Sequence, residues 1–310
     1  MIKKKVSIIG AGNVGGTTAM RLFDTGLARV ALIDVVENVA RAKAYDLEDA
    51  QYAAKCNSRI EASSDFAAMD ASDVVVVTAG LPRKPGMTRE DLLAKNAQIM
   101  TQVCDGIKKF ADDAIVIIVS NPLDVMTYLA FKRTGFPRQK VFGMGVNLDT
   151  SRFANLIAKK LFVGTQDINA LVIGSHGETM LPLPRLTTVR GRALSELLKE
   201  EDIKDLVKQT QQRGAEIVGL YGSGSAYYAP SAAIVEIVKT ILSNETRQIP
   251  VSVCLDGEYG VRDVSIGVPA RIGARGIESV IELELTAPEK EGFEKSVESI
   301  QASIKELKLS

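Results

Sequence analysis

The chain has 310 residues, of which 46% are hydrophobic and 25% are charged, and its 38 basic residues are balanced by 38 acidic ones. This length predicts about two domains with a large core, and the charge balance argues against nucleic acid or an anionic membrane as a partner. No apolar run reaches the roughly 18 residues of a membrane span and no leader precedes the first strand, so we expect a cytoplasmic protein that binds no membrane and no nucleic acid.

An apolar strand is predicted at residues 6–9, and a helix is predicted after a short glycine-rich loop. The loop follows the GxGxxG pattern and consists of Gly10, Ala11, Gly12, Asn13, Val14 and Gly15. In this pattern the first glycine permits a tight turn, the second lets the backbone approach a pyrophosphate, and the third lets the helix pack closely on the strand. Because the helix N-terminus also presents free N–H groups, we predict that these six residues bind a dinucleotide.

A second strand, at residues 30–34, ends in Asp34, about 20 residues beyond the glycine loop. Methyltransferases and structural turns can imitate a lone glycine loop, so this acid is the discriminating feature. A carboxylate at this place accepts hydrogen bonds from the ribose hydroxyls of the adenosine and repels a 2′-phosphate. The combination predicts NAD, rather than NADP, as the cofactor.

Helices and strands continue to alternate through the first half of the chain. Further strands are predicted at 59–62, 73–78, 114–121 and 141–145, and helices at 39–54, 89–110 and 123–133. Such alternation is typical of βαβ units, whose strands are apolar throughout because both faces of the sheet are covered. We therefore predict an α/β fold in which residues 1–146 form a Rossmann domain with a doubly wound parallel sheet.

Residues 79–88 show no regular periodicity and contain two prolines and two glycines, so we predict a loop. Arg83 lies inside this loop and Arg89 directly follows it. Arginines on a surface loop are often merely solvated. This loop, however, leaves the carboxyl end of a parallel strand beside the predicted nucleotide site, which is where α/β proteins bind their ligands.

A helix that begins near residue 147 places Asp149 and Arg152 three residues apart on one face. One interpretation is a capping acid in an ion pair that contributes only about 0.2–0.5 kcal/mol. The other is that Asp149 orients a histidine, while the planar fork of Arg152 binds a substrate carboxylate.

His176 is the only histidine in the sequence. Apolar residues 171–173 lead into Gly174, which predicts a short buried strand and places the imidazole in the loop at its end. A histidine in such a place is often only hydrogen-bonded within a turn, but an imidazole can also exchange a proton near neutral pH. Since the chain also supplies a nucleotide cradle, three arginines and a carboxylate, we interpret His176 as the proton-transferring group.

The rest of the second half mixes helices and strands without a repeat or a linker. Strands are predicted at 181–189, where two prolines favour a sheet edge, and at 249–255 and 264–272; helices are predicted at 193–198, 201–220, 230–242 and 286–307. We predict that residues 147–310 form an α+β substrate-binding domain, tightly joined to the first. One histidine and three scattered cysteines cannot build a common zinc site, so no metal is expected.

Taken together, the motifs resemble those of the lactate/malate dehydrogenase family, in particular its lactate-dehydrogenase-like malate dehydrogenase branch. The resemblance covers essentially the whole chain and is carried by residues 9–15, 78–89, 119–124, 148–152 and 173–178. It implies that His176 donates and accepts the proton, with Asp149 as its partner. It also implies that Arg152 binds the carboxylate beside the reacting carbon.

The resemblance assigns further roles around the same site. Arg89 is expected to polarise the carbonyl oxygen when the loop closes, and Asn121 to bond the reacting oxygen. Cofactor contacts are expected from Asn96, Val119, Ser120 and Asn121.

The choice of substrate depends on Arg83. Oxaloacetate carries a second carboxylate that pyruvate lacks, and the fork of Arg83 on the closing loop can pair with it. In similar lactate dehydrogenases the matching position is typically glutamine. We therefore expect reversible, NAD-dependent oxidation of (S)-malate to oxaloacetate, with L-lactate or another 2-hydroxy acid as the alternative substrate. A dinucleotide sensor without catalysis is a remoter alternative. The resemblance implies a homotetramer, with a dimer as the other possibility.

Overall fold

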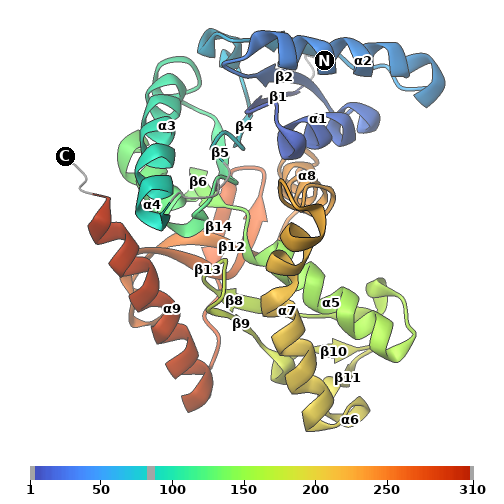
Figure 1. Ribbon diagram of the computed structural model, residues 1–310, viewed down its shortest axis with the longest axis vertical. Coiled ribbons are helices and arrows are strands. Elements are labelled where there is room, and N and C mark those ends of the chain that lie inside the picture. Colours follow the sequence, from blue (N-terminus) through green and yellow to red (C-terminus); the bar gives the residue numbers. More distant parts are fainter. Residues whose placement is uncertain (1–3, 82–87, 308–310) are drawn as a thin grey trace.

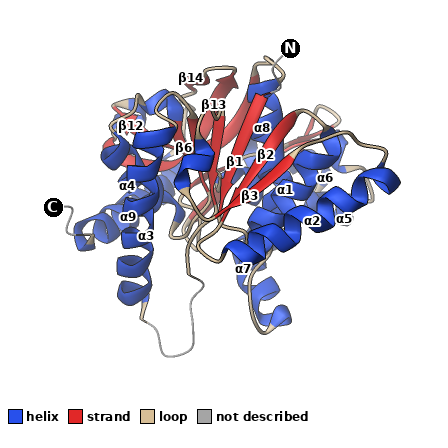
Figure 2. Cartoon of the chain, turned by 90° about the horizontal axis from the view of Figure 1, so that it is seen from above, coloured by secondary structure: helices blue, strands red, loops and turns tan. Residues whose placement is uncertain are grey.

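The computed structural model describes residues 4–81 and 88–307. Its main feature is a mixed sheet of 11 strands, and a second sheet of three strands accompanies it. Figure 2 shows the strands crossing the centre of the molecule, with helices on either side of them. The arrangement is an α/β fold.

The first half of the chain builds the parallel part of the large sheet. Its strands lie in the order β3-β2-β1-β4-β5-β6, and every neighbouring pair is parallel. This order is that of a doubly wound Rossmann sheet, which opens a ligand crevice where the order reverses, beside β1. The predicted fold class is confirmed. The strands are β1 (Lys4–Ile9), β2 (Ala28–Ile33), β3 (Ile60–Ser63), β4 (Val74–Val77), β5 (Ile115–Ile118) and β6 (Val141–Gly143).

Four helices accompany these strands, and they lie close to the predicted ranges. They are α1 (Asn13–Thr25), α2 (Glu37–Ala54), α3 (Arg89–Phe110) and α4 (Leu123–Thr134). Thr88 caps α3 through a capping box with Asp91, which explains why this helix begins where the loop ends. Within the described ranges, no helix is long and apolar enough to cross a membrane.

The second half extends the same sheet with antiparallel strands, in the order β6-β12-β13-β8-β9, and β14 pairs with β13. The small sheet has the order β11-β10-β7. The strands of the second half are β7 (Ile168–Asn169), β8 (Val172–Gly174), β9 (Met180–Pro182), β10 (Thr188–Val189), β11 (Arg192–Ala193), β12 (Arg247–Asp256), β13 (Arg262–Gly273) and β14 (Gly276–Val280). The helices of this half are α5 (Val146–Leu161), α6 (Leu194–Leu197), α7 (Glu200–Tyr221), α8 (Tyr228–Leu242) and α9 (Ala287–Glu306).

One pairing joins the halves, and a second pairing, within the second half, positions the loop that carries His176. Ser252 of β12 pairs with Gly143 of β6, and Gly267 of β13 pairs with Gly174 of β8. A Cβ on Gly267 would lie 2.6 Å from the carbonyl oxygen of Gly174, so only glycine lets these strands approach so closely. The end of β8 is therefore held against the sheet, directly before His176.

One segment differs from its prediction. Residues 181–189 do not form a single strand: β9 ends at Pro182, a 3-10 turn covers Pro184–Leu186, and β10 belongs to the small sheet. Proline lacks the N–H that a continuing strand would donate, which explains the break. The predicted edge position is right, since β9 ends the large sheet. Strand β14 was not predicted.

A common hydrophobic core connects the two halves. One buried cluster includes side chains from β1, β4 and β5 as well as from β12, β13 and α8, and a smaller cluster lies between α5 and the small sheet. Helix α1 packs against α8, and both lie on the same side of the molecule in Figure 1. The two halves are therefore tightly joined, as predicted.

Candidate active site

The glycine loop has the geometry that a bound pyrophosphate requires. Gly10 has a φ of +103°, which favours glycine, and a Cβ on Gly15 would lie 1.8 Å from the carbonyl oxygen of Gly10. A Cβ on Gly12 would meet nothing within 4 Å, so the backbone is open on that side. Gly12 is also the N-cap of α1 and offers no side chain to its first N–H groups. These groups are available to an anion.

Asp34 lies at the end of β2, beside the glycine loop. One of its carboxylate oxygens accepts a hydrogen bond of 2.6 Å from the backbone N–H of Ala11, and the other accepts one of 2.9 Å from Val36. The carboxylate lines a cavity of about 320 Å³ together with Gly10, Gly12, the residues that follow β4 and side chains of α3. A cavity with an acid at its end and a glycine cradle at its wall fits an adenine dinucleotide.

Lys43 of α2 holds the loop from the other side, which sequence reasoning missed. Its ammonium group donates hydrogen bonds to the carbonyl oxygens of Ala11 and Gly12, at 2.6 and 2.9 Å. Burial lowers the pKa of Lys43, although Asp34 opposes this shift. The turn is thus fixed at both the N–H and the carbonyl of Ala11.

The polar residues after β5 face a second cavity of about 330 Å³. Val119 and Asn121 line it, and the Ser120 hydroxyl donates to the carbonyl oxygen of Ala79. Asn96 of α3 is buried, and its side-chain amide binds the backbones of Leu81 and Asn121. The amide of Asn96 therefore fixes the backbone on both sides of the crevice, and its direct contact with the cofactor stays a prediction.

His176 and Asp149 form the pair that the sequence predicted. The imidazole Nδ1 lies 2.6 Å from a carboxylate oxygen of Asp149, and the Asp149 side chain is fully buried. A carboxylate at Nδ1 selects the tautomer that carries its proton there, so that Nε2 is left to exchange a proton. The imidazole lines the second cavity.

The surroundings of His176 favour its protonated form. Burial lowers the pKa of the imidazole, but the charge of Asp149 and its hydrogen bond raise it, and Asp124 raises it further. Arg152 lowers it by a smaller amount. The net pKa lies above the ordinary value of 6.5. Reversible proton transfer interconverts the neutral and the protonated form of such an imidazole.

Arg152 connects the pair to the cavity. Its Nη1 donates a hydrogen bond of 2.9 Å to the second oxygen of Asp149, and its side chain is 12% exposed. The buried Nε makes no hydrogen bond to the residues that the structure describes. A nearly buried guanidinium with unused donors in a cavity is suited to bind a carboxylate.

Helix α7 completes the cavity, which sequence reasoning missed. Gln211 and Gly214 line it beside Arg152, and a Cβ on Gly214 would lie 3.5 Å from the guanidinium. The sequence predicts a helix over 201–220 but does not show that it lies beside Arg152. The signal that could have identified it is the glycine inside a long helix, which costs about 1 kcal/mol of helix stability and therefore suggests a special role.

Two of the predicted arginines cannot be placed. Arg83 lies in residues 82–87, outside the described residues, and only the backbone of Arg89 is described, as the first residue of α3. Their expected roles stay predictions.

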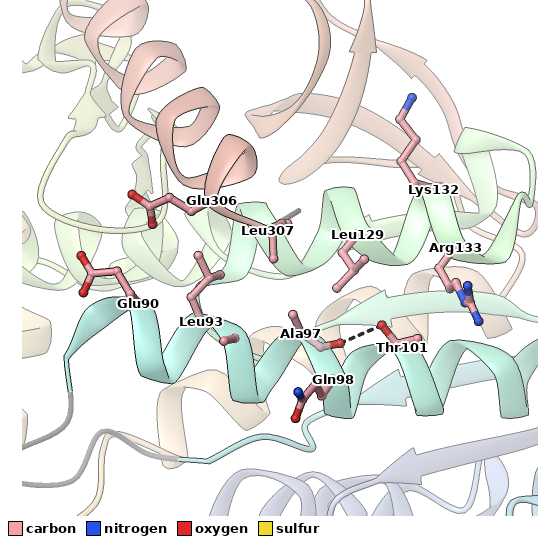
Figure 3. Close-up of a pocket in the computed structure, with 11 residues that line it drawn as sticks. Glu90, Leu93, Ala97, Gln98, Thr101, Leu129, Lys132, Arg133, Glu306 and Leu307 are labelled. Carbon is pink, nitrogen blue, oxygen red and sulfur yellow. Dashed lines mark hydrogen bonds between the residues drawn. The ribbon is translucent and has the colours of Figure 1, made fainter. Parts of the chain in front are cut away.

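A larger cavity, of about 750 Å³, lies between α3, α4 and α9 (Figure 3), and His176 does not line it. Lys132 and Arg133 line it, but they already pair with Asp263 and Asp105. It contains none of the predicted site residues. Among the residues that the structure describes, no group of three or more His, Cys, Asp or Glu could hold a metal ion.

Comparison with known proteins relates this geometry to a family. Residues 4–143 match the model of the lactate/malate dehydrogenase NAD binding domain, and residues 146–309 match that of the alpha/beta C-terminal domain of the same family. The chain belongs to the lactate/malate dehydrogenase family. Within this family it is 46% identical over 300 residues to a malate dehydrogenase of Synechocystis, a match that covers 97% of this chain and 93% of the relative.

Solved structures from both branches of the family are similar to it. The crystal structure of Cryptosporidium parvum malate dehydrogenase superimposes with a TM-score of 0.96 at 39% identity and covers 99% of both chains. The lactate dehydrogenase of the same organism, complexed with lactic acid and nicotinamide adenine dinucleotide, has a TM-score of 0.96 at 34% identity and covers 100% of this chain and 99% of its own. The fold alone therefore does not separate the two activities.

Proposed function

We propose that this protein is an NAD-dependent malate dehydrogenase, which interconverts (S)-malate and oxaloacetate. The observation that carries the proposal is the imidazole of the His176–Asp149 pair, which lines one cavity with Arg152, whose Nε has no hydrogen-bond partner among the described residues. The full-length similarity to malate dehydrogenases supports the choice of substrate.

The first half of the chain holds the cofactor in this proposal. Gly10, Ala11, Gly12, Asn13, Val14 and Gly15 bind the pyrophosphate, and Asp34 accepts hydrogen bonds from the ribose hydroxyls of the adenosine. Asn96, Val119, Ser120 and Asn121 lie toward the nicotinamide. The bound dinucleotide supplies the hydride acceptor for malate and the hydride donor for oxaloacetate. The match to the NAD binding domain supports this assignment.

The protein's own residues handle the proton. In malate oxidation, neutral His176 accepts the hydroxyl proton at Nε2, and Asp149 stabilises the imidazolium that forms. In oxaloacetate reduction the imidazolium is the starting form and returns the proton to the carbonyl oxygen. The raised pKa of His176 supports this second direction near neutral pH.

Cationic and amide groups bind the substrate. Arg152 pairs with the carboxylate next to the reacting carbon, and Asn121 bonds the reacting oxygen. Arg89 polarises that oxygen when the loop closes over it, which also excludes water and strengthens every charge contact inside. Arg83 pairs with the distal carboxylate and sets the preference for a dicarboxylate.

Lactate dehydrogenase activity is the second candidate, because a lactate dehydrogenase matches the fold as closely as a malate dehydrogenase does. Arg83 is the discriminating residue. If the site enclosed pyruvate, the guanidinium of Arg83 would have no partner in a site that excludes water, which would cost roughly 3–5 kcal/mol.

We also propose that the protein is a cytoplasmic homotetramer. In each chain, a Rossmann domain and an α+β domain meet at a boundary near residue 146. Large apolar side chains are exposed on α2 and at the end of α7, which supports association between copies. They are Val39, Tyr45, Tyr52, Leu220 and Tyr221. Gel filtration with light scattering separates a tetramer from a dimer.

Initial rates with NADH and either oxaloacetate or pyruvate test the function. We expect oxaloacetate to be favoured by at least about 10³-fold in kcat/KM, and Arg83→Gln to lower this ratio sharply. His176→Asn is expected to reduce turnover by several powers of ten while NADH still binds, because general acid–base catalysis is lost and the cradle is intact. Equal rates with both substrates, or an unchanged ratio in Arg83→Gln, would refute the malate assignment.

A further inference from the structure

Asp124 is a buried acid next to the proposed site, and the mechanism described above does not use it. It lies in the first turn of α4, two residues after Pro122, and is only 4% exposed. One carboxylate oxygen accepts a hydrogen bond of 2.8 Å from the backbone N–H of His176. The other accepts one of 2.6 Å from the hydroxyl of Ser252 on β12.

No lysine or arginine in the described part of the chain forms an ion pair with this carboxylate. Burial raises the pKa of Asp124 to about 6, although the hydrogen bonds from Ser252 and His176 and the charge of His176 act in the opposite direction; Asp149 adds to the rise. A buried acid without a basic partner is costly to keep. A merely structural contact in this position could be made by a neutral side chain.

The packing around Asp124 brings three parts of the site together. A Cβ on Gly145 would lie 2.1 Å from Leu123 and 2.9 Å from the Cβ of His176, so the first turn of α4 and the histidine meet over this glycine. Asn121 lies just before this turn, separated from it by the N-cap Pro122. Asp124 thus ties the backbone of His176 to the segment that carries Asn121, across the junction of the two halves.

We propose that Asp124 is a positioning residue for His176: its carboxylate fixes the histidine backbone and adds a second negative charge that favours the imidazolium. This inference rests on the proposed function. Asp149 contacts the ring nitrogen of His176, whereas Asp124 accepts the hydrogen bond of its backbone N–H.

Among the described residues, the charged groups that shift the pKa of His176 lie on elements packed around it, and Glu178 lines the same cavity. Asp149 and Arg152 come from α5, and Asp124 comes from α4. Ser252 from β12 is neutral and acts only through Asp124. A change at Asp124 that leaves the other groups in place therefore isolates its charge.

Asp124→Asn provides that change, because an amide oxygen can still accept from the N–H of His176 while the negative charge is lost. As His176 is the only histidine, an untagged protein labelled at histidine gives a single imidazole titration in an NMR experiment. We expect the pKa of His176 to be lower by about one unit in the variant than in the unaltered protein. The alkaline limit of oxaloacetate reduction should move to lower pH by the same amount.

Asp105→Asn is the matched control, because Asp105 also anchors α4, through Arg133, but does so at the far end of the helix and is exposed. It should leave both titrations unchanged. Ser252→Ala is a second variant that keeps the acid and removes its hydroxyl donor. It should shift the pKa of His176 in the same direction by a smaller amount, whereas Ser265→Ala, at another buried serine of the same hairpin, should not.

An unchanged imidazole pKa in Asp124→Asn would overturn the proposal. If that variant does not fold, an unchanged pKa in Ser252→Ala would do so. The imidazole titration needs no substrate, so it also separates the two levels of the argument. Absence of activity on oxaloacetate in the unaltered protein contradicts the proposed function, whereas the titration alone decides the effect of Asp124.

Discussion

Asp149→Asn is the sharpest test of the proton-transfer pair. The change is almost isosteric, but it removes the carboxylate that contacts the imidazole ring, at 2.6 Å from Nδ1. An amide can present its oxygen either to His176 or to Arg152, not to both as the carboxylate does. If the amide nitrogen faces Nδ1, the imidazole must carry its proton on Nε2, which is the wrong tautomer to accept one from malate.

The expected effect follows from the burial of the pair. A nearby opposite charge is generally worth 1–3 pKa units, and each unit corresponds to about 1.4 kcal/mol. Asp149 is fully buried, so solvent does not screen its charge, but it shares that charge with Arg152. We therefore expect oxaloacetate reduction at neutral pH to fall by about 10²- to 10³-fold.

The pH profile of oxaloacetate reduction shows in which direction the pKa of His176 shifts. Oxaloacetate reduction starts from the imidazolium, so activity is present below the pKa of His176 and is lost as the pH rises through it. Removing Asp149 lowers this pKa, and the alkaline limit of the profile should shift toward acid pH. Initial rates of NADH oxidation across the pH range measure both effects, and NADH fluorescence reports whether the cofactor still binds.

Asp167→Asn is the control, because this acid pairs with Arg190 on the surface of the same half of the chain. It should behave like the unaltered protein. If Asp149→Asn retains more than about a tenth of the activity at all pH values, the carboxylate does not support the proton transfer, and the assignment is wrong.

Two further predictions concern cofactor choice and stability. Asp34→Ser should narrow the preference for NADH over NADPH, since the acid that repels a 2′-phosphate is gone; equal catalytic efficiency with both cofactors in the unaltered protein would show that Asp34 does not face the ribose. Asp124→Asn should raise the melting temperature by a few degrees above pH 7 but not near pH 4. The reason is that burial raises the pKa of Asp124 in the folded protein to about 6, above the unfolded value of 3.8. The protonated acid therefore contributes stability below pH 3.8, and this stability is lost as the pH rises through about 6. Equal shifts in calorimetry at both pH values would contradict this reasoning.

The local features of the site could be predicted from the sequence. A glycine loop between a strand and a helix, an acid at the end of the next strand and an Asp–Arg pair on one helical turn all depend on near neighbours in the chain. The contact between Asp149 and His176 is less local: the residues left two interpretations of Asp149 open, and the family resemblance implied the pairing.

The features that were missed depend on packing between distant segments. Nothing near Gly214 in the sequence shows that α7 lies beside Arg152, and nothing near Asp124 shows that its carboxylate meets the backbone of His176. Strand β14 is defined by its pairing with β13, which the sequence near it does not reveal. Periodicity describes the faces of an element and does not identify what covers them.

The pairing of β12 with β6 has a consequence for how the chain can be divided. Since the sheet runs through the junction, cutting the chain between the halves would expose an open strand edge on each piece, with unpaired N–H and C=O groups. The same edge of β6 is uncovered during synthesis until β12 has been made. Isolated halves should therefore aggregate, or recombine with each other through this edge, and would be poor starting points for domain exchange with a relative.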